Sequence, residues 1–241
     1  MQYHKSVRLL DNLYCYIWSG MGNNCNTCVF TDVLKGDKPH VIIDPGHISN
    51  EADEDCLGSL SQSMKKDGIE LKDLGLIINT HSHPDHCQSN EEIVKISGAT
   101  VTMSEEENAF RTTAGDRMYT MFGMRAPRFD PAFFLKEGEV RLGKDDFNIQ
   151  VMLCPGHSPG SVCLYLPDSK VLITGDVVFY MSVGRTDFPG GSTRLLQRSI
   201  ERLAKLDAEF LVPGHNTEPN GVIRGRDMIK RNFQAIKMYF E

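Results

Sequence analysis

The chain has 241 residues, 40% of them hydrophobic, which is enough to bury a substantial core and fits one large domain over residues 1–241 better than two. Its formal net charge of -6 and its pI near 5.8 argue against a broad nucleic-acid-binding surface. The N-terminal sequence lacks the basic start and apolar core of a secretion signal, and no later stretch is long and apolar enough to cross a bilayer. We therefore expect a cytoplasmic enzyme with a small-molecule substrate and with neither nucleic acid nor a membrane as a partner.

The first quarter is rich in short strands, and the rest alternates helices with strands. In chain order, the aromatic, branched and apolar patterns predict strands over 13–18, 26–33 and 40–46, a helix over 53–68 ending at Gly68, a strand over 74–79, a helix over 91–98 and a strand over 99–104. After a long irregular region they predict 141–154, which is long enough for two strands, then strands over 162–167 and 170–176, a helix over 195–207, a strand over 209–215 and a terminal helix over 222–240. This order indicates an α/β fold with helices packed on sheet faces.

The seven cysteines are odd in number and scattered along the chain, so reduced thiols fit better than a disulfide framework. Cys25 and Cys28 have the C-x-x-C spacing of redox and zinc motifs. A zinc ribbon needs a second pair, however, and a redox motif should open a helix, whereas NTCVF reads as a strand. We interpret this pair as structural.

Residues of metal-binding type gather where four predicted strands end. They are His81, His83, Asp85 and His86 after 74–79, His157 after 141–154, Asp176 at the end of 170–176 and His215 at the end of 209–215. In α/β sheets, loops beyond the strand ends converge on a rigid support, so residues distant in sequence meet there. The other histidines lack this context: we expect His4 and His40 to be solvated and His47 to be structural.

The spacing inside THSHPDH, residues 80–86, suits two metal ions. Residues two apart in an extended segment face the same way, so His81 and His83 can share one ion, while a turn at Pro84 can direct Asp85 and His86 toward a second. Imidazoles mixed with carboxylates suit zinc, iron or manganese, whereas magnesium and calcium prefer oxygen ligands. The sequence thus predicts a metal centre with two divalent ions, zinc being the first expectation.

In the same order along nearly the whole chain, the motifs THSHPDH, CPGHSPGS, LITGD and VPGH resemble those of the metallo-β-lactamase superfamily. The resemblance implies a four-layer αββα sandwich. It also implies one metal on His81, His83 and His157, a second on Asp85, His86 and His215, and Asp176 bridging the two. Asp44, in IIDPG, would orient a ligand from behind the site.

Within that superfamily the segments HSPGSVCLY and GRTDFPGGS look most like glyoxalase II-like thioester hydrolases, also called hydroxyacylglutathione hydrolases. Their full-length type carries a C-terminal helical extension that holds glutathione, and this chain has only a short helix after His215, which puts glutathione specificity in doubt. The implied activity is attack of a metal-bound hydroxide on a thioester or related acyl substrate, with Asp85, Asp176 and His157 as catalytic residues.

Three other readings stay open. Persulfide dioxygenases are similar in fold and in the GRTDF loop, but hold a single iron on the residues matching His81, His157 and Asp176. A dinuclear centre can also hydrolyse a lactone, β-lactam or phosphodiester, and a non-catalytic metal-binding scaffold is the remaining reading. The segment 104–137, rich in Met, Arg and Phe, is either a substrate-pocket wall or a surface cap or dimer contact, and the terminal helix packs on its own domain or in a homodimer. Arg185 and Asp187 are expected to pin their loop by pairing.

Overall fold

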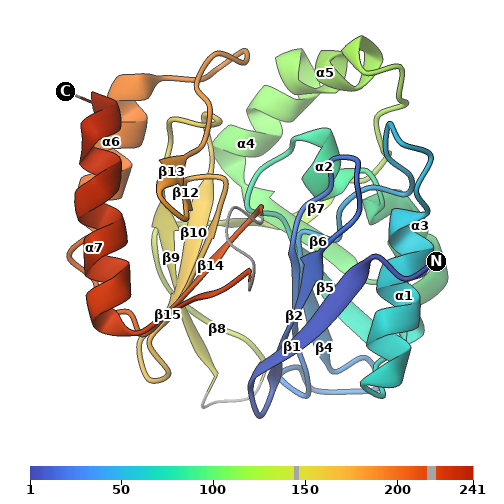
Figure 1. Cartoon of the computed structure of the whole chain (residues 1–241). Helices are drawn as coiled ribbons and strands as arrows, with labels where there is room; N and C mark the ends of the chain where they lie inside the picture. Colours follow the sequence, from blue (N-terminus) through green and yellow to red (C-terminus); the bar gives the residue numbers. More distant parts are fainter. Residues whose placement is uncertain (144–146, 216–220, 241) are drawn as a thin grey trace.

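Two β-sheets face each other at the centre of the computed structural model, which describes residues 1–143, 147–215 and 221–240 (Figure 1). In spatial order, the described part of the first sheet consists of β1 (His4–Leu10), β2 (Leu13–Trp18), β3 (Thr27–Phe30), β4 (His40–Ile43), β5 (Leu74–Ile78), β6 (Thr100–Ser104) and β7 (Pro131–Leu135). The described part of the second consists of β15 (Ile223–Arg224), β14 (Phe210–Pro213), β11 (Val171–Gly175), β10 (Val162–Leu166), β9 (Asn148–Leu153) and β8 (Gly138–Arg141).

Helices cover the outer face of each sheet, as Figure 1 shows. The first sheet is covered by α1 (Cys56–Lys66) and α3 (Asn90–Ser97), and the second by α6 (Thr193–Leu203) and α7 (Arg226–Ile236). Shorter elements are α2 (Pro84–Cys87), α4 (Glu105–Phe110), the π-helical turn η2 (Arg111–Gly115), α5 (Asp116–Met121), the 3-10 turns η1 (Leu71–Asp73) and η3 (Lys237–Phe240), and the ribbon of β12 (Val178–Phe179) and β13 (Ser182–Val183). The arrangement confirms the predicted four-layer αββα sandwich.

Three apolar clusters hold these layers together. The central one lies between the sheets and includes Phe30 and Ile78 from the first and Leu164 and Val212 from the second. A second cluster packs α6 and α7 on the second sheet, and a third packs α1 and α3 on the first. Because α7 buries one face in its own fold, the terminal helix packs on its own domain.

Parallel pairing brings several strand ends to one edge. Strands β4, β5, β6 and β7 run parallel in the first sheet, and β11 and β14 run parallel in the second. The loops that leave the carboxyl ends of β4, β5, β11 and β14 therefore open toward the same region, as the sequence pattern predicts. Among the described residues, no helix has the length and hydropathy needed to span a bilayer.

Most predicted elements are found within a few residues of their expected bounds, and three expectations are wrong. Residues 4–10 form the edge strand β1, which was not predicted because much of it is exposed and polar. The region taken as irregular after 104 contains α4, η2, α5 and β7. The terminal helix begins at Arg226, because 222–225 first supplies β15 and Gly225 has φ of +91°.

His4 is a further correction, because it is buried and not solvated. It begins β1 beneath α1, where its Nδ1 lies 3.1 Å from Ser59 Oγ and its ring packs on Trp18 at a centroid distance of 4.9 Å. Burial lowers the pKa of His4 to about 4. His40 is half-buried, and its Nδ1 accepts a hydrogen bond from the Asp32 amide.

The cysteines match the sequence interpretation. All seven are free and buried. Cys28 lies in β3 and its Sγ is 3.4 Å from that of Cys15 on the neighbouring strand, whereas the Cys25 thiol contacts the Asp44 carbonyl oxygen at 3.2 Å. The two cysteines of the C-x-x-C spacing thus have different partners and pack as structural residues.

Candidate metal centre

Four loops at strand ends bring all the sequence-predicted site residues together. His81 and His83 follow β5, Asp85 and His86 lie in α2, His157 lies between β9 and β10, Asp176 follows β11, and His215 follows β14. The side chains form two adjoining groups whose ligand-type atoms lie within 4.8 Å of one another. The geometry of each group decides whether a cation fits.

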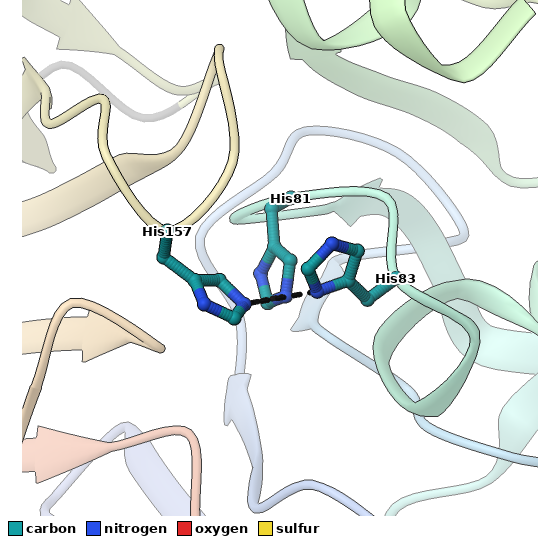
Figure 2. A group of neighbouring side chains, drawn as sticks. All are labelled: His81, His83 and His157. Atoms are coloured by element: carbon teal, nitrogen blue, oxygen red, sulfur yellow. Dashed lines mark hydrogen bonds between the residues drawn. The ribbon is translucent and has the colours of Figure 1, made fainter. Parts of the chain in front are cut away.

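The first group consists of three buried histidines, whose rings point toward one another in Figure 2. His157 Nε2 lies 3.2 Å from His81 Nε2 and 2.9 Å from His83 Nδ1. Nitrogen lone pairs this close repel one another unless a proton or a metal ion lies between them. Three imidazoles converging on one point match the nitrogen ligands that zinc and related metals take in proteins.

The second group mixes two histidines with two carboxylates. His215 Nε2 lies 3.0 Å from Asp85 Oδ2 and 3.3 Å from Asp176 Oδ2, and His86 Nε2 lies 3.2 Å from Asp176 Oδ1. Asp176 Oδ2 is also 3.6 Å from His157 Nε2, in the first group. Asp176 therefore stands between the two groups, where a bridging carboxylate would stand.

Partners outside the groups fix which ring nitrogens carry protons. His157 Nδ1 is 2.7 Å from the Arg185 carbonyl oxygen, which only accepts, so Nδ1 carries the proton and the Nε2 lone pair faces inward. His86 Nδ1 donates in the same way to Asp44 Oδ2 at 2.9 Å. This donor set fits a cation, because the inward atoms are the ones free to bind it.

Charge differs sharply between the groups. Burial lowers the pKa of His81 well below its ordinary value and that of His83 to about 3, so both are neutral. Burial opposes charge on His86 and His215 too, but the nearby carboxylates outweigh it: they raise the pKa of His86 well above its ordinary value and that of His215 to about 10. The two imidazoles in turn hold the pKa of Asp176 well below its usual range. A metal ion binding here would displace the imidazole protons.

Asp44 holds the site from behind, as the resemblance implies. Its Oδ1 accepts from the Thr80 amide at 2.8 Å, and its Oδ2 accepts from Thr80 Oγ1 at 2.5 Å as well as from His86. Thr80 Oγ1 in turn lies 3.0 Å from His81 Nδ1, and because its own proton goes to Asp44 it accepts the imidazole proton. One carboxylate therefore orients a histidine of each group.

Glu107 is a site residue that the sequence interpretation missed. This buried carboxylate accepts from the Ser82 amide at 2.8 Å, from Ser82 Oγ at 2.7 Å, from the Gly160 amide at 2.9 Å and from Ser158 Oγ. It thereby ties the loop of His81 and His83 to the loop of His157. The S-x-x-E pattern of Ser104 and Glu107, a helix-start signal, could have placed α4 here.

A cavity of about 740 Å³ opens over the two groups. Its described lining includes His83, Asp85, His157, Asp176 and His215 from the groups, with Asn23, His47, Glu51, Pro84, Met118, Met121, Phe122, Met124, Phe179, Val183, Arg185 and Phe188 around them. Four of these lie in 118–124, so part of the segment 104–137 is a pocket wall. His47 also supports the structure, with its Nδ1 3.0 Å from Gln88 Oε1.

The loop of Arg185 contributes in two ways. The guanidinium pairs with Asp187 through Nε to Oδ1 at 2.7 Å and through a second nitrogen to Oδ2 at 2.5 Å, which confirms the expected loop-pinning pair. Its backbone carbonyl holds His157, as described above. Gly184 is required beside it, because a Cβ there would lie 1.8 Å from the Asp176 carbonyl oxygen.

A family comparison decides the class. The metallo-beta-lactamase superfamily model matches residues 24–215. The chain belongs to the metallo-β-lactamase superfamily. Together with the histidine and aspartate cluster, this match supports a metal-dependent hydrolase.

Two relatives within the metallo-β-lactamase superfamily are named as hydrolases. Probable metallo-hydrolase YqgX of Bacillus subtilis is 32% identical over 187 residues, which cover 77% of this chain and 83% of that protein. Hydroxyacylglutathione hydrolase GloC of Haemophilus influenzae is 32% identical over 187 residues, which cover 75% and 82%. The solved structure of TTHA1623 in a di-iron-bound form aligns with a TM-score of 0.66 and 26% identity, covering 88% of this chain and 98% of that chain.

Proposed function

We propose that this metallo-β-lactamase superfamily member hydrolyses a thioester or a related acyl substrate with the help of two divalent metal ions. The observation that carries the proposal is the pair of adjoining groups with Asp176 between them. Zinc is the first choice for a set of imidazoles and carboxylates, and iron and manganese also suit it. In this proposal His81, His83 and His157 would hold one ion, Asp85, His86 and His215 would hold the other, and Asp176 would contact both.

When bound, such ions lower the pKa of a coordinated water from that of bulk water to about 7, which supplies hydroxide at neutral pH. The protein's own residues arrange the rest. Asp44 and the Arg185 carbonyl hold the imidazoles with their lone pairs inward. Asn23 donates from Nδ2 to Asp85 Oδ2 at 2.9 Å and so orients that carboxylate at the cavity floor. The cavity has the size of a small-molecule site.

The thioester assignment is supported by the motif HSPGSVCLY and by the name of the Haemophilus influenzae relative. The GRTDF loop does not separate the two readings, because persulfide dioxygenases resemble this chain there too. Two ions are supported by the di-iron form of TTHA1623. A persulfide dioxygenase would need only His81, His157 and Asp176. The close packing of Asp85, His86 and His215 beside them supports the hydrolase, because these side chains supply ligand types for a second ion.

The test begins with metal content by elemental analysis on protein purified without chelator under anaerobic conditions. We expect about two equivalents of zinc, manganese or iron per chain, and hydrolysis in a panel of thioesters with a free-thiol readout. Asp176→Asn and His157→Ala should lose turnover while keeping the far-ultraviolet circular dichroism of the parent protein. Asp11→Asn, at a fully exposed carboxylate in the turn between β1 and β2, is the control and should stay active.

Two outcomes would overturn the proposal. Near-normal turnover in Asp176→Asn would show that the candidate metal centre takes no part in the reaction. A single iron per chain, together with oxygen uptake on a persulfide, would make the protein a dioxygenase.

A further inference from the structure

Part of the cavity lining is apolar. It includes Met118, Met121, Phe122, Met124 and Phe188, and we call these five residues the apolar wall. Met121 is 70% exposed and Phe122 is 51% exposed. Large apolar side chains gathered at a cavity mouth mark a surface that binds an apolar group.

The apolar wall starts at the candidate metal centre. The Phe188 ring meets the His83 ring edge to face at a centroid distance of 5.6 Å, and the Phe122 ring meets Phe188 in the same way at 6.3 Å. His83 belongs to the first histidine group. A substituent extending from a carbonyl held at the groups would therefore run along these rings toward solvent.

Away from the candidate metal centre, charge around the cavity does not favour an anionic carrier. Among the described lining residues, Arg185 is the one arginine or lysine. Its guanidinium pairs with Asp187 and stacks over the Phe188 ring, 3.9 Å from the ring centroid. Glu51 adds a negative charge to the rim. A carboxylate-bearing thiol such as glutathione would have to compete with Asp187 for its counter-ion.

We propose that the apolar wall binds an uncharged, apolar group of the substrate, and that the enzyme prefers uncharged apolar thioesters over glutathione thioesters. This inference rests on the proposed hydrolase function and names its substrate class. Met side chains adapt to chains of different shape, so a range of aliphatic groups should be accepted.

The test uses thioethers, which have no thioester bond to hydrolyse, so that binding is measured apart from turnover. S-alkyl N-acetylcysteamines with alkyl chains of increasing length, and S-alkyl glutathiones with the same chains, are titrated into the zinc-loaded protein by calorimetry. We expect affinity in the neutral series to rise about two- to fourfold for each added methylene, and the matched glutathione compounds to bind more weakly.

Variants of the apolar wall test whether these side chains cause the dependence of affinity on chain length. Phe122→Ser should lower affinity for the longest neutral thioether by about tenfold and leave the shortest unchanged. Met121→Ser, at the other exposed position, should act in the same direction and serves if the first variant folds poorly. Phe133→Ser is the matched control, because Phe133 is 44% exposed on β7 and does not line the cavity.

The outcomes separate the two proposals. Affinity that does not change with chain length, or tighter binding of the glutathione series, overturns the apolar subsite. If the thioethers bind with the expected length dependence but no corresponding thioester releases thiol, the subsite stands and the thioesterase function fails.

Discussion

Single side chains decide how the candidate metal centre is held, and Asp44 is the clearest case. It has φ of +49°, a conformation that few non-glycine residues adopt, and in this position it reaches both Thr80 and His86. An unfavourable backbone conformation of this kind persists only where surrounding contacts stabilise it, as the hydrogen bonds of Asp44 to Thr80 and His86 do here.

Replacing Asp44 tests that role. In Asp44→Asn an uncharged amide faces His86, so the imidazole loses its negative partner, and we expect metal affinity to fall about 10- to 100-fold. Competition with a chromogenic chelator measures it. Asp11→Asn, which removes a fully exposed carboxylate in the turn between β1 and β2, should keep parental affinity; equal affinities in both variants would contradict the role.

His4 should make stability depend on pH. Its pKa is about 4 in the fold against 6.5 unfolded, so the unfolded chain binds a proton first as pH falls. The fold therefore loses stability from about pH 6.5 down to about pH 4, on the order of 3 kcal/mol for this group. Urea unfolding of metal-free protein at a series of pH values should give a flatter profile for His4→Gln than for the parent. Parallel profiles would show that His4 does not contribute.

For single residues, the sequence predicts the candidate metal ligands better than it predicts other buried polar side chains. His81 and His157 could be found because each follows an apolar strand in a known pattern. His4 and Glu107 could not, because their burial depends on α1 and on two loops that are distant in sequence.

Among the elements, α4 links the two ligand loops through one carboxylate. Glu107 lies in its first turn, capped by Ser104, and receives four hydrogen bonds from Ser82, Ser158 and Gly160. An amide has one acceptor atom where a carboxylate has two, so Glu107→Gln leaves a buried donor unsatisfied.

We expect Glu107→Gln to destabilise the fold by about 1–3 kcal/mol and to weaken metal binding, because the His81 and His157 loops lose their common tie. Thermal melts and metal titration measure the two effects. Glu106→Gln, an exposed neighbour in the same turn, is the control. A loss of stability with unchanged metal affinity would leave Glu107 a purely structural residue.

The apolar strands that precede the site were predicted more accurately than α4, η2 and α5. Strands such as β5 and β11 are short apolar runs with clear ends. The segment 105–121 is divided into three short helical pieces with exposed Met and Thr residues, so it has no sustained apolar period to reveal it. That part of this segment faces the cavity can be seen only in the folded structure, where the two sheets place the candidate metal centre beside it.

Across the whole molecule, the proposed ligand residues come from both sheets. His81, His83, Asp85 and His86 follow a strand of the first sheet, whereas His157, Asp176 and His215 follow strands of the second. A bound ion therefore joins the two halves of the sandwich and should stabilise the folded chain relative to the unfolded one.

Metal removal should consequently lower the melting temperature. At a free zinc concentration about 100 times the dissociation constant, the stabilisation would be about 2.7 kcal/mol. Thermal melts across a buffered zinc series should show a melting temperature that rises with zinc, with a smaller rise in Asp176→Asn. A melting temperature that is independent of zinc would contradict a cation that joins the sheets.

The fold class and the ligand order were visible in the sequence because both depend on which strands precede which loops. The cavity was only partly visible, since it is formed by side chains of 118–124 and 183–188 that meet through the packing of the two halves. Neither segment has a pattern of its own that points to the other.

The spread of the ligands also bears on biosynthesis. During synthesis His81 is added to the chain long before His215. The nascent chain can therefore pair β4 with β5 while the second group still lacks His215. The complete centre exists only after β14 has joined the second sheet beside β11. Completion of the second group is then a late step of folding, and a chain stalled before that strand would carry an unfinished site however well its first half had folded.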